Sequence, residues 1–204
     1  YVLPYYSEFF YEPLYQFYAE NSSFVVNWKD TGFLQMIRSI VAPKQKLNVV
    51  QIPDETEVSI AVHIRRGGNF DPAENRGNDP RKFPPLHYYA KQLQEVYKRF
   101  EGKRIFVYVF TDDLDVRLLV KEINAMIHGE KHRLHYRESG TSEVLHVLDD
   151  FFSISKFDVL IRPCSNFSYI AGKLGQLKLE IAPKYCSTEG GFIQITEVEV
   201  IEHE

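Results

Sequence analysis

The spacing of apolar residues changes repeatedly along the chain and predicts an alternation of strands and helices after residue 57. Short uninterrupted apolar runs are typical of strands buried on both faces, whereas apolar residues three and four positions apart indicate helices with one buried face. The predicted strands cover residues 58–63, 104–110, 133–136, 157–162 and 177–181. The predicted helices cover residues 84–101, 116–127, 141–152 and 165–174.

This order of elements predicts a Rossmann-like α/β fold, in which a doubly wound parallel sheet is covered by helices on both faces. Residues 192–201 alternate between apolar and polar and predict a further edge strand. Thr141 and Ser165 are the expected N-caps of the last two helices, and Gly175 follows the second of them. In these helical patterns we expect Met126 and Leu148 to be buried.

The amino-terminal part has a different pattern. Residues 1–30 are rich in tyrosine and phenylalanine, which predicts a segment that packs against a larger body. Residues 31–42 place apolar side chains at helical spacing. We therefore expect two parts, a helical and aromatic packing segment at 1–50 and a Rossmann-like domain at 51–204.

Length and composition narrow the classes of protein. The chain has 204 residues, a hydrophobic content of 44 % and a formal net charge of -4. The chain can therefore form a substantial hydrophobic core. Its net negative charge gives no indication that it binds nucleic acid. No apolar run is long enough to span a membrane. Cys164 and Cys186 lack the spacing of a zinc site, and we expect both to be small buried side chains.

Three polar motifs follow predicted strands. The first strand ends in His-Ile-Arg-Arg-Gly-Gly at 63–68, the second in Thr-Asp-Asp at 111–113, and the fourth is followed by Cys-Ser-Asn-Phe-Ser at 164–168. Because ligands of open α/β sheets bind beyond the carboxyl ends of the strands, we expect the three motifs to converge on one edge. Two arginines with permanent positive charge, followed by glycines, indicate a diphosphate site there.

These motifs resemble those of the superfamily of α1,2-, α1,6- and protein-O-fucosyltransferases. His-Ile-Arg-Arg-Gly at 63–67 is similar to the first motif of that family, and Val-Phe-Thr-Asp-Asp at 109–113 is similar to the second. The segments 148–152, 157–160 and 165–168 are together similar to the third. The order and spacing agree over about residues 57–183.

The resemblance implies a donor-binding domain of the GT-B type and an inverting glycosyltransferase that uses GDP-fucose without a metal. It implies no cofactor, and a glycan or another hydroxyl compound as acceptor. By position, the residues implied in donor binding are His63, Arg65, Arg66, Asp112, Asp149, Ser165 and Asn166.

The chemistry of sugar transfer gives a separate reason for arginines at this place. Negative charge grows on the departing diphosphate while the sugar becomes oxocarbenium-like, so that a metal-free protein must supply the positive charge itself. Arg65 and Arg66 would do so as catalytic residues. Ser165 and Asn166, at a helix start, would add backbone amide donors toward phosphate.

The other residues each have a structural interpretation as well. By resemblance, His63 and Asp149 would contact the guanine and ribose, but a histidine at a strand end can be a core residue and Asp149 can be a solvated helix residue. Asp112 and Asp113 can cap the following helix, and we expect that at least one does. Ser165 is expected to cap its helix with or without a phosphate.

The expected catalytic base lies in the polar loop at 69–83. Glu74 is the first candidate and Asp71 the second, since an acceptor hydroxyl needs a carboxylate within hydrogen-bond reach. Gly68 stands where members of the family often carry an acidic or hydroxyl residue. About fifty residues precede the first motif, too few for the second Rossmann-like domain of a GT-B enzyme.

Two hypotheses follow. The chain is a fucosyltransferase-like enzyme, or it is a non-catalytic module of the same origin that binds a GDP-sugar or a glycan. A third class, an unrelated phosphate-binding α/β enzyme, is disfavoured because the sequence has no P-loop and no Gly-x-Ser-x-Gly turn.

Overall fold

The computed structural model describes residues 28–44, 46–67, 79–127, 132–138, 146–189 and 192–203. The aromatic segment before Trp28, the expected cap Thr141, and Asp71 and Glu74 lie outside these residues. The chain divides into two compact units, residues 1–42 and 43–204, which we describe separately.

In the first unit, the described residues form one helix, α2, at Thr31–Val41. Asp30 caps it, because its carboxylate accepts a hydrogen bond from the backbone N–H of Phe33 at 3.0 Å. The ring of Trp28 meets that of Phe33 edge to face, with centroids 6.0 Å apart. The helix expected at residues 31–42 is thus present.

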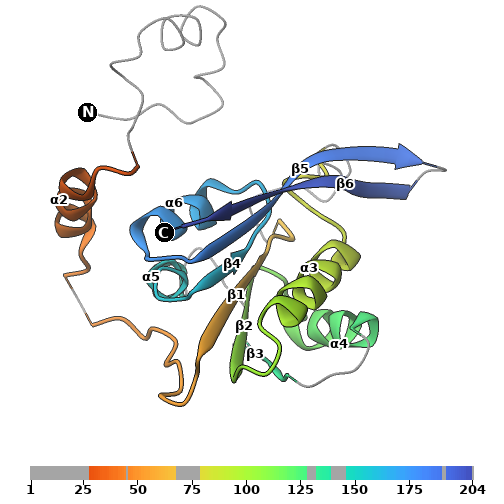
Figure 1. The fold of residues 1–204 in the computed structure, drawn as a ribbon, viewed down its shortest axis with the longest axis horizontal. Coiled ribbons are helices and arrows are strands. Elements are labelled where there is room, and N and C mark those ends of the chain that lie inside the picture. The colour runs from red at the N-terminus through yellow and green to blue at the C-terminus, as the bar shows by residue number, and fades with distance from the viewer. Residues whose placement is uncertain are drawn as a thin grey trace, which may run out of the picture. The chain divides into compact units, whose positions relative to one another are not determined.

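The second unit contains a six-stranded sheet in the order β3-β2-β1-β4-β5-β6 (Figure 1). Its strands are β1 Val58–Ile64, β2 Ile105–Thr111, β3 Leu134–Tyr136, β4 Val159–Ile161, β5 Leu179–Glu189 and β6 Phe192–Glu202. The first five run parallel, and β6 pairs antiparallel with β5. The predicted Rossmann-like α/β fold is therefore confirmed, with a mostly parallel sheet.

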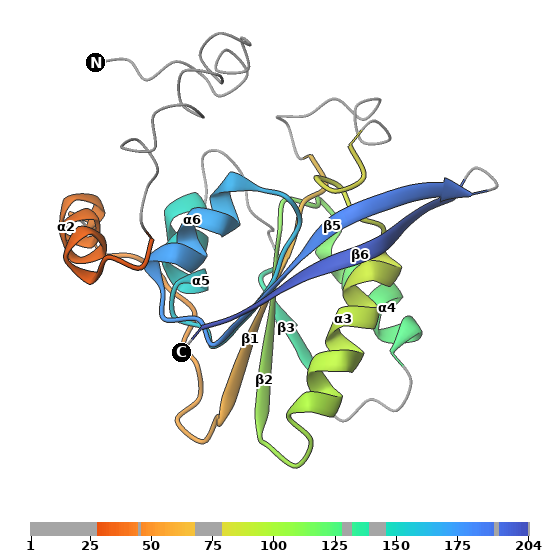
Figure 2. The ribbon, with the colours of Figure 1, turned by 45° about the horizontal axis from the view of Figure 1, so that its top comes forward.

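Four helices cover the two faces of this sheet. They are α3 Leu86–Arg99, α4 Val116–Met126, α5 Val147–Ile154 and α6 Asn166–Leu174. Figure 2 shows α3 and α4 on one side of the sheet and α5 and α6 on the other. Each pair packs on its own hydrophobic cluster. Because side chains alternate along a strand, β1 sends Ile60, Val62 and Ile64 into one cluster and Ala61 into the other.

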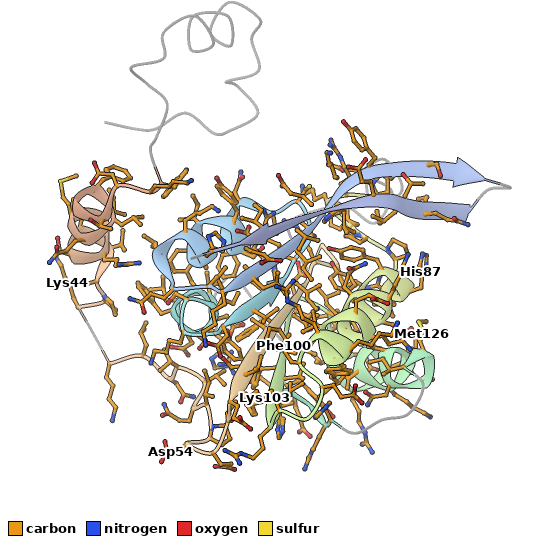
Figure 3. All side chains as sticks on the ribbon, viewed as in Figure 1. Lys44, Asp54, His87, Phe100, Lys103 and Met126 are labelled. Carbon is orange, nitrogen blue, oxygen red and sulfur yellow. The ribbon has the colours of Figure 1, made fainter. Side chains whose placement is uncertain are left out.

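Some expectations about caps and burial are wrong. The helix expected after Thr141 starts at Val147, with His146 at the N-cap position in the left-handed conformation. Leu148 is 51 % exposed, because the face of α5 toward the protein instead buries Asp150, Ser153 and Ile154. Met126, labelled on α4 in Figure 3, is 40 % exposed.

Both cysteines also differ from expectation, since Cys164 and Cys186 are exposed free thiols. Cys164 follows β4 where the chain leaves the sheet, and Cys186 lies in the part of β5 beyond its pairing with β4. Their positions at and beyond the edge of the sheet, rather than within its covered faces, account for this exposure.

Candidate anion-binding site

The chain order of the sheet reverses between β1 and β4, and the proposed site lies where these two strands end. β1 pairs with β2 on one side and with β4 on the other, and both neighbours run parallel to it. In a doubly wound sheet, ligands usually bind where the strand order reverses in this way. Residues 65–67 follow β1 at this point, and residues 162–165 follow β4.

The loop after β1 is held by a carboxylate from the next strand. One oxygen of Asp112 accepts a hydrogen bond from the backbone N–H of Arg66, and the other accepts from the N–H of Gly67 at 3.1 Å. Gly67 has a φ of 97°, a left-handed conformation that disfavours residues with a side chain. The glycine of the first motif is therefore required by the backbone of the loop.

The two arginines of this loop are both partly exposed. Arg66 Nε lies 3.3 Å from Asp113 Oδ2, and the guanidinium of Arg65 lies 6.0 Å from the ring centroid of Phe83. The Arg66 side chain remains 34 % exposed in its ion pair. A ligand could therefore reach its guanidinium from the solvent.

Asp112 and Asp113 do not cap α4, contrary to our expectation. The cap is Asp115, whose carboxylate accepts from the N–H of Leu118 at 3.0 Å. Asp113 instead accepts from the N–H of Asp115 and pairs with Arg66. Burial raises the pKa of Asp112, although the N–H of Arg66 and the charge of Arg65 oppose this.

His63 is the penultimate residue of β1 and is buried. It is 7 % exposed, and its Nδ1 is buried without a hydrogen-bond partner in the described part of the chain. Burial, followed by the charges of Arg65 and Arg162, lowers the pKa of His63 to about 3. The imidazole is therefore neutral near pH 7, and an unpaired buried nitrogen of this kind calls for an explanation such as a ligand.

The first turn of α6 adjoins this histidine. The ring of Phe167 lies 5.6 Å from that of His63, measured between centroids. Ser165 occupies the N-cap position as expected, but its side chain makes no capping hydrogen bond. Asn166 begins the helix and is exposed. The amide groups at this helix start are therefore not satisfied by the expected cap and are suited to an anion.

The sequence reasoning missed Arg162, which directly follows β4. Its side chain is 8 % exposed, and its Nε donates a hydrogen bond to Glu180 Oε1 at 2.6 Å. The signal was present, because Glu180 interrupts the apolar run of β5 and a carboxylate inside a buried strand requires a partner. Arg162 thus follows the strand that precedes the third motif, but its guanidinium is buried against Glu180.

Asp149 is not an ordinary solvated helix residue. One of its oxygens accepts from the backbone N–H of Asn48 at 2.8 Å, and the other lies 3.1 Å from His146 Nδ1. Partial burial would raise the pKa of Asp149, but these bonds hold it below its ordinary value. Within the described residues its bonds join α5 to the segment before β1, and none reaches Arg65 or Arg66.

In the described residues, His63 thus adjoins Phe167 of α6 and is affected by the charge of Arg65, while Asp112 bonds the backbone of the arginine loop. Asp149 is engaged elsewhere, and Gly68, Asp71 and Glu74 lie outside the described residues. Among the described residues, no group of three His, Cys, Asp or Glu side chains could hold a metal ion. The helices formed by these residues are too short or too polar to cross a membrane.

No protein-family profile and no curated protein matches this sequence. Among solved structures, the chain is similar to the selenomethionine form of the fucosyltransferase NodZ from Bradyrhizobium, with a TM-score of 0.45 and 12 % identity. This match covers 85 % of this chain and 47 % of that one. A second match, to POFUT1 in complex with GDP, has a TM-score of 0.41 and 15 % identity, over 71 % of this chain and 43 % of that one. The chain spans a little under half the length of the solved structures it matches.

Proposed function

We propose that the site binds the diphosphate of a nucleotide sugar, and that the protein acts as a glycosyltransferase. The observation that carries this proposal is the juxtaposition of two features: a neutral His63, whose Nδ1 has no partner among the described residues, and the start of α6, where the N-cap side chain makes no capping bond. A neutral ring nitrogen, the backbone amides of a helix start and guanidinium groups together suit an anion that also carries hydroxyl groups.

In this proposal the arginines act on the leaving group. Arg66 and Arg65 neutralise the charge that grows on the diphosphate as its bond to the sugar breaks, and Asp112 keeps their loop in place before the reaction. Ser165 and Asn166 bind phosphate oxygen through the helix start. These groups supply positive charge without a metal ion.

The motifs that resemble the fucosyltransferase superfamily make GDP-fucose the donor we propose, with inversion at the sugar carbon. By the same resemblance, His63 would contact the ribose or the guanine. Asp149 would contact guanine only if it exchanged at least one of its present bonds to Asn48 and His146. The acceptor would be a glycan or another hydroxyl compound, deprotonated by Glu74 with Asp71 as the alternative base.

A second candidate is a module that binds a GDP-sugar without transferring it. It is favoured by Gly68, which replaces the acidic or hydroxyl residue that the related motif often carries after Arg-Arg-Gly. Both candidates require the same nucleotide site and differ only in whether the sugar leaves.

The test is binding and turnover of GDP, GDP-fucose and UDP by the wild type and by Arg66→Ala, Arg66→Lys and Arg117→Ala. We expect GDP to bind more tightly than UDP, and Arg66→Ala to weaken GDP binding by about 2–4 kcal/mol. Lysine should not restore binding, because a point charge cannot replace the planar fork. Arg117, exposed on α4, is the control whose loss should change nothing.

Normal GDP affinity in Arg66→Ala would refute the proposed site. Selective GDP binding without release of fucose to water or to any acceptor on a glycan array would favour the non-catalytic module. Release of GDP from GDP-fucose would favour the enzyme.

A further inference from the structure

The buried carboxylate of Glu180 lies close to three basic side chains. Glu180 is 1 % exposed, and its Oε1 accepts from Arg162 Nε at 2.6 Å. Its Oε2 lies 3.1 Å from Lys173 Nζ and 3.5 Å from His203 Nε2. Burial alone would raise the pKa of Glu180, but Arg162 and Lys173 hold it below its ordinary value. Glu180 is therefore anionic at neutral pH.

Arg162 differs from the other two partners because it also holds the turn between β4 and α6. Its Nη1 donates to the carbonyl of Pro163 at 3.1 Å, while its own carbonyl accepts from the hydroxyl of Tyr88 at 3.1 Å. After Pro163, the N–H of Cys164 donates to the carbonyl of Arg81 at 2.8 Å. The turn is thus bonded on several sides immediately before Ser165.

Lys173 reaches the same carboxylate from the last turn of α6 and has no described bond to residues 162–165. Both Arg162 and Lys173 also lie over the ring of Tyr169, at 5.1 and 5.0 Å from its centroid. The two cations therefore share an anion and an aromatic neighbour, but only one of them is bonded to the turn that starts the helix.

We propose that Arg162, oriented by Glu180, is a positioning residue that fixes the Pro163–Ser165 turn and so aims the first amides of α6 into the site. The part of this inference that concerns the ligand rests on the proposed function. The planar guanidinium of Arg162 bonds Glu180 with one nitrogen and Pro163 with another, and so defines the orientation of the turn. A single ammonium group cannot do this.

The test compares Arg162→Lys with Lys173→Met. Arg162→Lys keeps the charge and the pair with Glu180 but loses the fork, whereas Lys173→Met removes a cation from the same carboxylate and leaves the turn bonded. Amide hydrogen exchange at Cys164 and Ser165 reports the turn, whose N–H groups bond to Arg81 and Pro163. Thermal unfolding reports stability, and calorimetry reports GDP affinity.

We expect Arg162→Lys to speed exchange at these two amides and to weaken GDP binding roughly tenfold, with Lys173→Met doing neither. Normal exchange in Arg162→Lys, or equal acceleration in both variants, would overturn the positioning role. Faster exchange with unchanged GDP affinity would overturn its link to the ligand. A wild-type protein that binds no GDP would refute the proposed function, while the exchange comparison would still decide the role of Arg162 in the turn.

Discussion

Asp112 Oδ2 lies 3.1 Å from the backbone nitrogen of Gly67, and this bond joins the end of β2 to the loop after β1. The parallel register places Thr111 opposite Ile64, so that both strands leave the sheet side by side. The second oxygen of the same carboxylate bonds the N–H of Arg66. The conformation of the arginine loop is therefore set by the neighbouring strand as well as by its own sequence.

Removal of this carboxylate should loosen the arginine loop. We expect Asp112→Ala to lower the free energy of unfolding by about 1–3 kcal/mol, because two partly buried N–H groups lose their acceptor, and to weaken GDP binding as well. Asp115→Ala is the control, since it removes the cap of α4 at a cost of about 1 kcal/mol and should leave GDP affinity unchanged. Denaturant unfolding and calorimetry measure both effects, and equal GDP affinities would contradict this role of Asp112.

A side chain at position 67 should strain the same loop. Gly67→Ala is expected to destabilise the fold by about 1–2 kcal/mol, because φ is 97° there, and to reduce GDP affinity. Gly102→Ala provides a matched comparison, since its φ is 82° and no atom lies within 4 Å of the added carbon. It should lower stability by a similar amount without an effect on GDP. If neither variant changes GDP binding, the loop has no part in the site.

The buried imidazole makes stability depend on pH. The pKa of His63 is about 3 in the folded protein, compared with an ordinary value of 6.5 for histidine. As the pH falls below 6.5 the unfolded chain gains a proton that folded His63 does not, so stability is lost down to about pH 3. This residue should contribute a loss of about 1.4 kcal/mol per pH unit in that window.

The measurement is the free energy of unfolding from pH 7 to pH 4 for the wild type and His63→Leu. The wild type should lose stability more steeply, since carboxylates contribute similarly in both proteins. Parallel curves would mean that His63 is protonated in the folded protein.

Removal of metal should not abolish nucleotide binding. The proposed cations are Arg65 and Arg66, so that GDP affinity and any transfer should be the same with and without a chelator. Titration calorimetry after treatment with EDTA, with and without added Mg²⁺ or Mn²⁺, provides the measurement. A strict requirement for either ion would show that the arginines do not replace a metal ion at this site.

Kinetics can separate the role of the proposed base from that of the proposed donor site. If the protein transfers sugar, Glu74→Gln should lower kcat by about 100-fold or more and leave GDP affinity nearly unchanged, because a base acts only on the acceptor. Asp71→Asn is the matched variant. A loss of turnover in Asp71→Asn alone would transfer the role to Asp71.

Apolar spacing was sufficient to predict the order of strands and helices and hence the convergence of the motifs. The apolar run in β1, for example, is fully buried and is followed by the arginine loop as expected. Spacing did not locate the start of α5, because the apolar pattern was expected to bury Leu148. In the structure the helix instead buries Asp150, which pairs with Arg137 at 2.6 Å.

Contacts between distant residues were harder to predict. The acidic residues after β2 could serve as caps or as partners of the arginine loop, and only the register with β1 decides that Asp112 bonds the loop while Asp115 caps α4. Arg162 was missed because a single arginine after a strand is common, although Glu180 within β5 indicated a buried cation. The identity of that cation depends on the pairing of β4 with β5.

The glycine after α6 has a consequence at the opposite end of that helix. A Cβ at Gly175 would lie 2.6 Å from the carbonyl oxygen of Ser155, so that the chain ends of α5 and α6 meet there through bare backbone. The nine residues of α6 form a rod about 13 Å long, with Ser165 at its other end. A methyl group at position 175 would have to shift or tilt α6, and the first turn of the helix would move as well. The direction of the first turn of α6 therefore depends on the absence of a side chain at the far end of the same helix.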